Sequence, residues 1–167
     1  MQTVGAQWLL VNQANAAILV PLVQVMDTAP DVLLSVIGGV LADTFDRRRL
    51  LVVVQGFLVI VGAILTALTL ANNMPPALLL TLTFLLGAGS AFAIPAYQAI
   101  IPDVVPRSEL TAASALGSIS INLGRAIGSA TAGVLIAQAG VGAVFAINTA
   151  TFLVFGLVMV AWRPPAG

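Results

Sequence analysis

Two long stretches without a charged residue constrain this chain more than any other feature of its sequence. The first covers 53 residues, Leu50–Pro102, and the second covers 37, Ala126–Trp162. A helix needs about 20 apolar residues to cross a membrane, so the first stretch has room for two spans and the second for one. A soluble helix bundle would need a polar face on each helix, and Leu50–Val54 and Phe57–Leu65 offer none. The sequence therefore predicts an all-α membrane protein.

The amino-acid composition excludes several classes of chemistry. The chain has no Cys, no His and no Lys, and only 7% of its residues are charged, against about 25% in soluble domains. Without these side chains it has no Ser-His triad, thiolate nucleophile, conventional zinc site, Schiff-base lysine or Walker lysine. A net charge of zero argues against a nucleic-acid partner. We therefore expect no enzyme activity, no metal, no cofactor and no nucleic acid.

Turn residues divide the apolar sequence into separate helices. Asn72 and Asn73, followed by the pair Pro75-Pro76, end one helix and begin the next, and Gly140 is a typical carboxyl-terminal cap. Residues 1–11 would rise only about 17 Å as a helix, which is too short for a hydrocarbon core of about 30 Å. We therefore expect a partial helix near 1–11 and spans near 15–42, 50–71, 77–97, 110–136 and 141–162.

The arginines indicate how the helices are oriented in the membrane. Five of them follow the second, fourth and sixth expected helices, namely Arg47, Arg48, Arg49, Arg107 and Arg163. The alternate loops, near 12–15, 72–76 and 137–140, carry none. Because cytoplasmic loops are enriched in Arg and Lys, we expect a multi-pass protein of the inner membrane with loops 43–49 and 98–109 and the carboxyl terminus in the cytoplasm.

The loop after the second expected helix resembles the signature loop of the major facilitator superfamily. That signature has a Gly, three residues, an Asp and then a basic cluster, and Gly39, Asp43 and Arg47 match it. Thr44 and Asp46 stand where the signature has a basic residue and a second Gly. Further along, two segments are similar to the fourth-to-fifth-helix region of the enterobactin-exporter-like and macrolide-efflux-like branch, Pro95–Arg107 and Asn122–Gly128.

The resemblance implies both a fold and an activity. The fold would be the six-helix amino-terminal half of the major facilitator fold, with the first helix truncated and the carboxy-terminal half absent. The activity would be proton-coupled efflux of amphipathic small molecules, drug-like or siderophore-like, by alternating access. In such families the loop of Gly39, Asp43 and Arg47 acts as a cytoplasmic gate. The expected partners are the substrate, the lipid bilayer, and the missing second half or a second copy.

Two departures from the family patterns bear on proton coupling. Thr83 stands four residues before Gly87, where many proton-coupled members have an Arg. Ser129 follows Gly128, where antiporters carry a Gly-Pro pair. Neither motif supports a coupling mechanism in this chain.

Two carboxyl side chains fall near the middle of the second expected helix. Asp27 and Asp31 are four residues apart and share a helix face with Gln24. A charge at the bilayer centre costs at least about 2.5 kcal/mol, so both acids should face a cavity or a partner. Because two adjacent carboxylates repel, they are candidates for proton coupling. In the alternative, Pro21 and Pro30 break the helix and the acids lie in a shallow, wet segment.

Arg125 lies near the middle of the fifth expected helix, with Asn122 on the same face. Together with Gln24 these residues are candidates for contact with substrate or for an ion pair with the acids. Pairing with an acid and attraction of an anionic substrate both remain open. For Arg48 and Arg49 we expect only orientation of the protein and binding of anionic lipid headgroups.

Three other functions are alternatives to efflux. The chain could be a non-transporting half-transporter or membrane partner subunit, or an inactive gene fragment. An intramembrane aspartyl enzyme is disfavoured, because its two acids should come from different helices and Asp27 and Asp31 share one.

Overall fold

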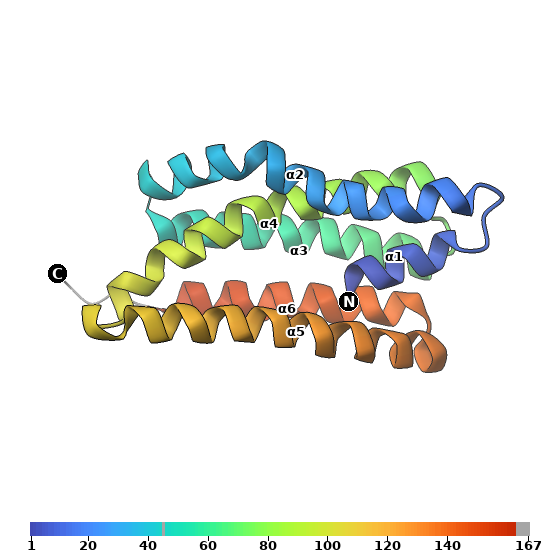
Figure 1. Cartoon of the computed structure of the whole chain (residues 1–167). Helices are drawn as coiled ribbons and strands as arrows, with labels where there is room; N and C mark the ends of the chain where they lie inside the picture. The colour runs from blue at the N-terminus through green and yellow to red at the C-terminus, as the bar shows by residue number, and fades with distance from the viewer. Residues whose placement is uncertain (45, 163–167) are drawn as a thin grey trace.

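The computed structural model confirms the all-helical membrane fold (Figure 1). It describes residues 1–44 and 46–162, with the backbone alone at residues 35, 41–43 and 102–104. Within these ranges, five helices are long and apolar enough to cross a membrane. The elements in chain order are α1 (Gln2–Leu10), α2 (Ala16–Thr44), α3 (Arg47–Leu70), α4 (Pro76–Val104), the 3₁₀ turn η1 (Arg107–Glu109), α5 (Leu110–Ala139) and α6 (Val141–Ala161).

Prolines lie inside two of the long helices without ending them. α2 is continuous through Pro21 and Pro30. α4 continues past Pro95 to Val104, although the sequence predicts an end near 97. A membrane helix tolerates proline because neighbouring helices and local adjustments satisfy the freed backbone groups. The alternative of a helix broken at its prolines is therefore wrong.

The helices pack unevenly around α3 and α4. α2 lies along α4, and α3 packs closely against both α4 and α6, whereas α5 makes sparser contact with α6 and α1. Figure 1 shows α2 on one side of the bundle and α5 and α6 on the other, with α4 running from the α2 side toward the start of α5. The amino terminus lies in the middle of the bundle, near α5 (Figure 1).

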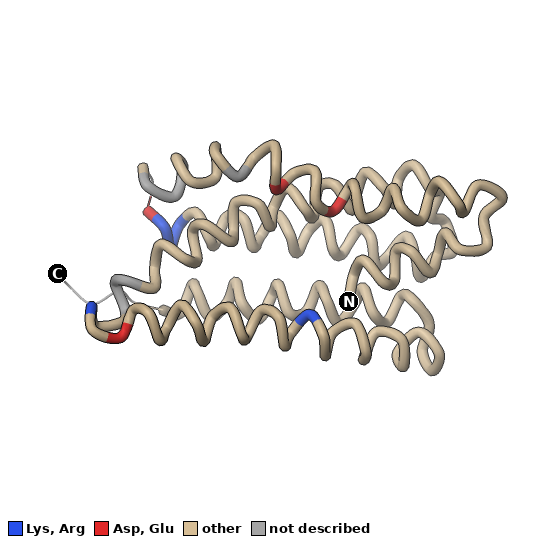
Figure 2. Tube along the Cα trace, viewed as in Figure 1, with Lys and Arg blue, Asp and Glu red and all other residues tan. Residues whose placement is uncertain are grey.

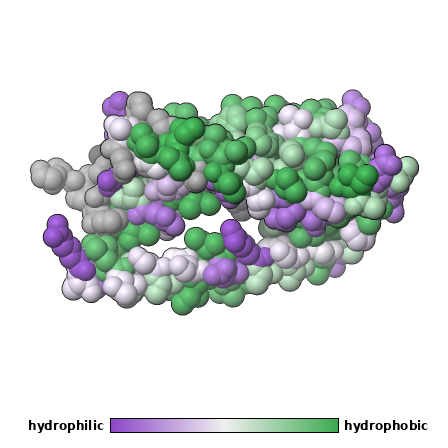
Figure 3. Space-filling view, turned by 45° about the horizontal axis from the view of Figure 1, so that its top comes forward, coloured by the Kyte–Doolittle hydropathy of each residue, from purple (hydrophilic) through white to green (hydrophobic). Residues whose placement is uncertain are grey.

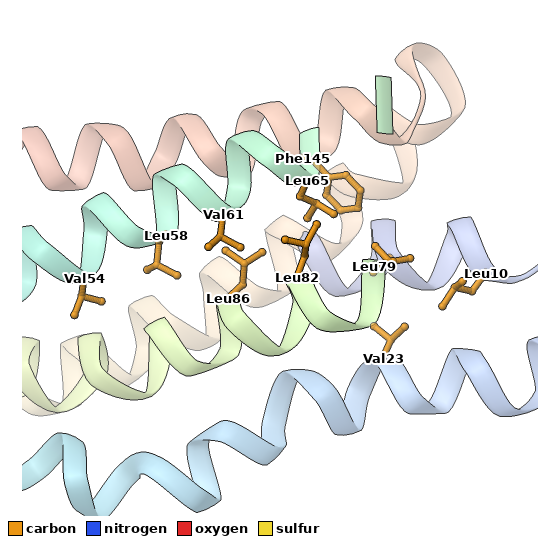
Figure 4. Packing of buried hydrophobic residues seen from close by; sticks show 11 residues of the cluster. Leu10, Val23, Val54, Leu58, Val61, Leu65, Leu79, Leu82, Leu86 and Phe145 are labelled. Carbon is orange, nitrogen blue, oxygen red and sulfur yellow. The ribbon is translucent and has the colours of Figure 1, made fainter. Parts of the chain in front are cut away.

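Buried leucine and valine side chains join α3 to α4. They recur every three or four residues, which places them on one face of each helix. Outward-facing side chains are also apolar, as expected for a surface in contact with lipid: Val32 is 79% exposed and Val53 is 70% exposed. The buried residues shown in Figure 4 include Val54, Leu58, Val61 and Leu65 of α3 and Leu79, Leu82 and Leu86 of α4.

Glycines allow α2 and α4 to approach each other closely. A Cβ atom added at Gly87 would lie 2.5 Å from the carbonyl oxygen of Asp27. One added at Gly38 would lie 2.8 Å from the carbonyl oxygen of Ala91. Small residues are common where membrane helices pack backbone to backbone. The α2–α4 contact therefore positions the turn of α2 that carries Asp27.

We expect Gly87→Ala to lower the free energy of unfolding by about 1–3 kcal/mol, because the added methyl group would force the Asp27 backbone away from α4. Gly56→Ala on α3 is the matched control, since nothing lies within 4 Å of a Cβ added there. The measurement is the midpoint of thermal unfolding in detergent. Equal midpoints for the two variants would contradict the close approach.

Candidate functional site

Asp27 lies where α2 meets α1 and α4. The hydroxyl of Thr3 on α1 donates a hydrogen bond of 3.2 Å to Oδ2 of Asp27. The side chain is partly buried. On the α4 side, the backbone of Asp27 contacts Gly87. Two neighbouring helices thus hold this carboxyl group in place.

Arg125 lies in the middle of α5, and the two acids lie on α2. Figure 2 shows the acidic positions of α2 and the basic position in the middle of α5 at a similar level along the bundle, on opposite sides. Within the described residues Arg125 is exposed and forms no ion pair or hydrogen bond. The structure therefore relates the three charges through space and not through direct contact.

The two amide candidates lie on separate helices. Gln24 and Asn122 are both exposed. Nδ2 of Asn122 donates a hydrogen bond of 3.0 Å to the carbonyl oxygen of Ser118, one turn earlier on α5. The backbone carbonyl oxygen of Gln24, not its amide group, accepts a hydrogen bond of 2.8 Å from the hydroxyl of Thr28. The bond of the Asn122 amide stays within α5, and the one at Gln24 stays within α2.

The expected gating loop is described in part. Nη1 of Arg47 donates a hydrogen bond of 2.7 Å to the carbonyl oxygen of Ala99, which joins the start of α3 to α4. A Cβ atom added at Gly39 would meet nothing within 4 Å. The side chain of Asp43 and the expected cytoplasmic carboxyl terminus, residues 163–167, lie outside the described residues. A brace between Asp43 and Arg47 remains a prediction.

Asp46 caps the amino end of α3. Its side chain accepts hydrogen bonds from the backbone N–H groups of Arg48 and Arg49, at 3.0 and 3.1 Å. These N–H groups lie in the first turn of the helix, where no backbone acceptor is available. Asp46, one of the two residues that depart from the family signature, thus caps the start of α3.

Arg48 has a structural role that the sequence analysis missed. Its Nε donates a hydrogen bond of 2.9 Å to the carbonyl oxygen of Met159, and Nη2 donates one to the carbonyl oxygen of Val160. Both carbonyls lie in the last turn of α6, where they have no partner within the helix. From the sequence we expected Arg48 only to orient the protein and bind lipid headgroups. The contacts with α6 add a structural role. No local signal identifies α6 as the neighbour.

A cavity of about 810 Å³ lies between α3, α4, α5 and α6. Its polar lining includes Gln55, Tyr97 and Ser114, and none of the expected site residues whose side chains the structure describes lines it. Gln55 is only 6% exposed, and its Oε1 has no hydrogen-bond partner among the residues that the structure describes. Figure 3 shows a hollow that separates the α5 side of the bundle from the rest.

Charged residues also gather at one end of the bundle. The loop before α3 and the η1 turn both lie there, and Figure 2 shows their acidic and basic positions at that end.

Among the described residues, no group of three or more Asp or Glu is placed to hold a metal ion.

Comparison with known proteins identifies relatives that are much longer than this chain. The staphyloferrin A transporter of Staphylococcus aureus (strain NCTC 8325 / PS 47) is 34% identical over 135 residues, 80% of this chain and 34% of that protein. Macrolide efflux protein A of Streptococcus pyogenes is 21% identical over 156 residues, 93% of this chain and 38% of that protein. An enterobactin exporter of Citrobacter koseri is 33% identical over 111 residues, 63% of this chain and 25% of that protein. No solved structure matches the chain.

The fold and these relatives define a multi-pass membrane protein of the major facilitator superfamily. Within it, the chain belongs to the transmembrane secretion effector family, whose pattern matches residues 1–167. The match confirms the resemblance to the amino-terminal half of such a transporter. The chain spans about a third of the length of the first two relatives.

Proposed function

We propose that this chain serves as half of an efflux transporter that exports amphipathic small molecules across the inner membrane. Family membership supports transport, and the relatives are named as siderophore transporters and macrolide efflux proteins. The observation that carries the coupling proposal is the pair of acids on α2, which lie at a similar level along the bundle to Arg125 on α5 (Figure 2). The process would be alternating access without a covalent step.

Asp27 and Asp31 are proposed as the proton-coupling pair, with Arg125 as their counter-charge. A carboxylate attracts the guanidinium group, and its protonated form does not. Protonation therefore removes an attraction between α2 and α5, which biases the balance between two arrangements of these helices. This pairing accounts for an arginine in the middle of a span, because a charge at that depth needs a partner or water.

Gln24 and Asn122 are proposed to contact the substrate. Each presents an exposed amide group on one of the two helices that carry the charges. An amide can both donate and accept hydrogen bonds, which suits neutral polar groups on an otherwise apolar compound. The transport path would be completed by a second half or a second copy of this chain.

The charged end of the bundle is proposed to face the cytoplasm. The arginines at the start of α3 and in η1 lie at that end, as the positive-inside rule requires. Gly39, Asp43 and Arg47 would form the gate there. The hydrogen bond from Arg47 to Ala99 links this gate to α4. A shift of α4 would therefore move Arg47 and change the conformation of the loop.

The proposal is tested by transport in everted membrane vesicles that contain the chain together with its second half. We expect a fluorescent amphipathic dye to accumulate when a proton gradient is imposed, and accumulation to collapse when a protonophore is added. Vesicles with a second half alone are the control. Accumulation that survives the protonophore would contradict proton coupling, and absence of transport for a panel of such dyes would contradict efflux.

A further inference from the structure

The two oxygens of the Asp27 carboxyl group have different surroundings. Oδ2 accepts the hydrogen bond of 3.2 Å from the hydroxyl of Thr3 on α1. Among the residues that the structure describes, Oδ1 accepts no hydrogen bond. In the same part of the chain, the buried side-chain atoms without a partner are Nε2 of Gln2 and Oε1 of Gln55. Oδ1 of Asp27 is not one of them, so protein does not enclose this oxygen.

The turn of α2 that carries Asp27 is held against α4. A Cβ atom added at Gly87 would lie 2.5 Å from the carbonyl oxygen of Asp27 and 3.2 Å from Cγ of Pro30. With no side chain between the two helices at this point, α2 cannot rotate here without displacing α4. The position of the carboxyl group is therefore fixed from the backbone side.

The helix that carries Thr3 is held in its turn by α6. A Cβ atom added at Gly5 would lie 2.9 Å from Cε1 of Phe145 on α6. Ala6 and Leu10 of α1 are buried in the same hydrophobic cluster as Phe145. The hydroxyl of Thr3 therefore has a fixed position relative to the core, and it meets one particular oxygen of Asp27.

A fixed donor decides which oxygen of a carboxyl group takes up a proton. A protonated carboxyl group carries the hydrogen on one oxygen and keeps acceptor capacity on the other. A proton on the oxygen that already faces a hydroxyl hydrogen would point at that hydrogen, so the other oxygen is favoured. A hydrogen bond to one ring nitrogen of histidine selects the protonated nitrogen in the same way.

The other charged groups near the middle of the bundle make no direct contact with Asp27. They are Asp31 one turn further along α2, Arg125 on α5 and the amino group of Met1 on α1. In α4 the sequence has no charged residue before Asp103. Among the described residues, no hydrogen bond or ion pair joins Asp27 to any of these groups, so its direct polar contact is Thr3.

We propose that Thr3 is a positioning residue that selects the oxygen of Asp27 on which a proton binds. Its hydroxyl group occupies Oδ2, and the proton binds Oδ1, which protein does not enclose. The ionised and protonated forms then differ at one defined atom, and the contact between α1 and α2 is kept in both. This inference rests on the proposed coupling role of Asp27 and adds a residue of α1 to it.

The test uses acid-minus-neutral infrared difference spectra of this chain in detergent. A protonated carboxyl group has a C=O stretching band, and the band that disappears in Asp27→Asn belongs to Asp27. A hydrogen bond to the C=O oxygen weakens the double bond and lowers its stretching frequency. Thr3→Val removes the donor at nearly the same size, and Thr3→Ser keeps it. Thr28→Val is the matched control, because the hydroxyl of Thr28 donates to the backbone of Gln24 and not to an acid.

We expect the Asp27 band to shift to higher frequency in Thr3→Val, because Oδ2, the C=O oxygen, has then lost its donor. Thr3→Ser and Thr28→Val should leave the band at the parental frequency. An unshifted band in Thr3→Val, or an equal shift in Thr3→Ser, would overturn the proposal and leave the coupling role of Asp27 untouched. Absence of any Asp27 band in acid would overturn the coupling role as well, so the two failures are distinguishable.

Discussion

Arg48→Gln is expected to lower the free energy of unfolding by at least about 2 kcal/mol, because it removes charge-assisted hydrogen bonds that contribute about 1.5–3 kcal/mol each. The guanidinium group of Arg48 donates to the carbonyl oxygens of Met159 and Val160 in the last turn of α6. Glutamine is shorter and uncharged, so it cannot reach both. The start of α3 and the end of α6 would then separate first on heating.

Arg49→Gln is the matched control for this prediction. Its side chain is 88% exposed and forms an ion pair of 3.7 Å with Asp46. Exposed ion pairs contribute about 0–1 kcal/mol, so this variant should unfold almost like the parent. Thermal unfolding in detergent measures both, and limited proteolysis reports whether the end of α6 is released. Equal destabilisation of the two variants would show that the carbonyl contacts add nothing to stability.

In the proposed efflux transporter, Asp27→Asn is expected to abolish proton-driven efflux while membrane insertion is unchanged. Asparagine has nearly the same size, and its Oδ1 can still accept the hydrogen bond from Thr3. It cannot bind and release a proton, and it does not attract Arg125 as a carboxylate does. The loss should therefore appear in transport and not in the amount of folded protein in the membrane. Dye accumulation in everted vesicles measures it.

Asp46→Asn provides the matched control, because asparagine caps a helix about as well as aspartate and the residue lies outside the span. This variant should retain parental efflux. Asp31→Asn tests the second member of the pair in the same assay. Undiminished proton-driven efflux in both the Asp27 and the Asp31 variants would rule out the coupling assignment.

Local signals in the sequence predict where most helices begin and end. The amides and prolines before residue 77 and the glycine at position 140 separate the helices much as expected. Prolines within spans do not by themselves determine where a helix ends. Pro30 and Pro95 disrupt an isolated helix, but in a bundle their effect depends on whether neighbours can satisfy the freed carbonyls. That condition involves residues distant in the sequence. The alternative of a break at Pro30 was therefore wrong, and α4 runs past the expected end near 97 to Val104.

In the candidate site, too, some features follow from the sequence alone and others depend on packing. The spacing of Asp27 and Asp31 places them on one face of a helix, whatever surrounds it. The contact between Thr3 and Asp27 joins residues that are 24 positions apart in the sequence. The contact between Arg48 and Met159 joins residues that are 111 positions apart. No periodicity within one helix encodes either contact. Both require the rotation of each helix about its axis, which is set by packing.

The sequence by itself determined the class of this protein. The free energy of moving a side chain from water to lipid belongs to each residue and adds up along the chain, so the charge-free stretches alone place it in the membrane. Five arginines and a short loop motif then indicate its orientation and family. Only the tertiary structure decided that Arg48 holds the end of α6, that Thr3 binds Asp27 and that the first half of α5 lines a cavity. These contacts arise because the lipid-facing and protein-facing sides of such helices are almost equally apolar, and packing of small and large side chains selects between them.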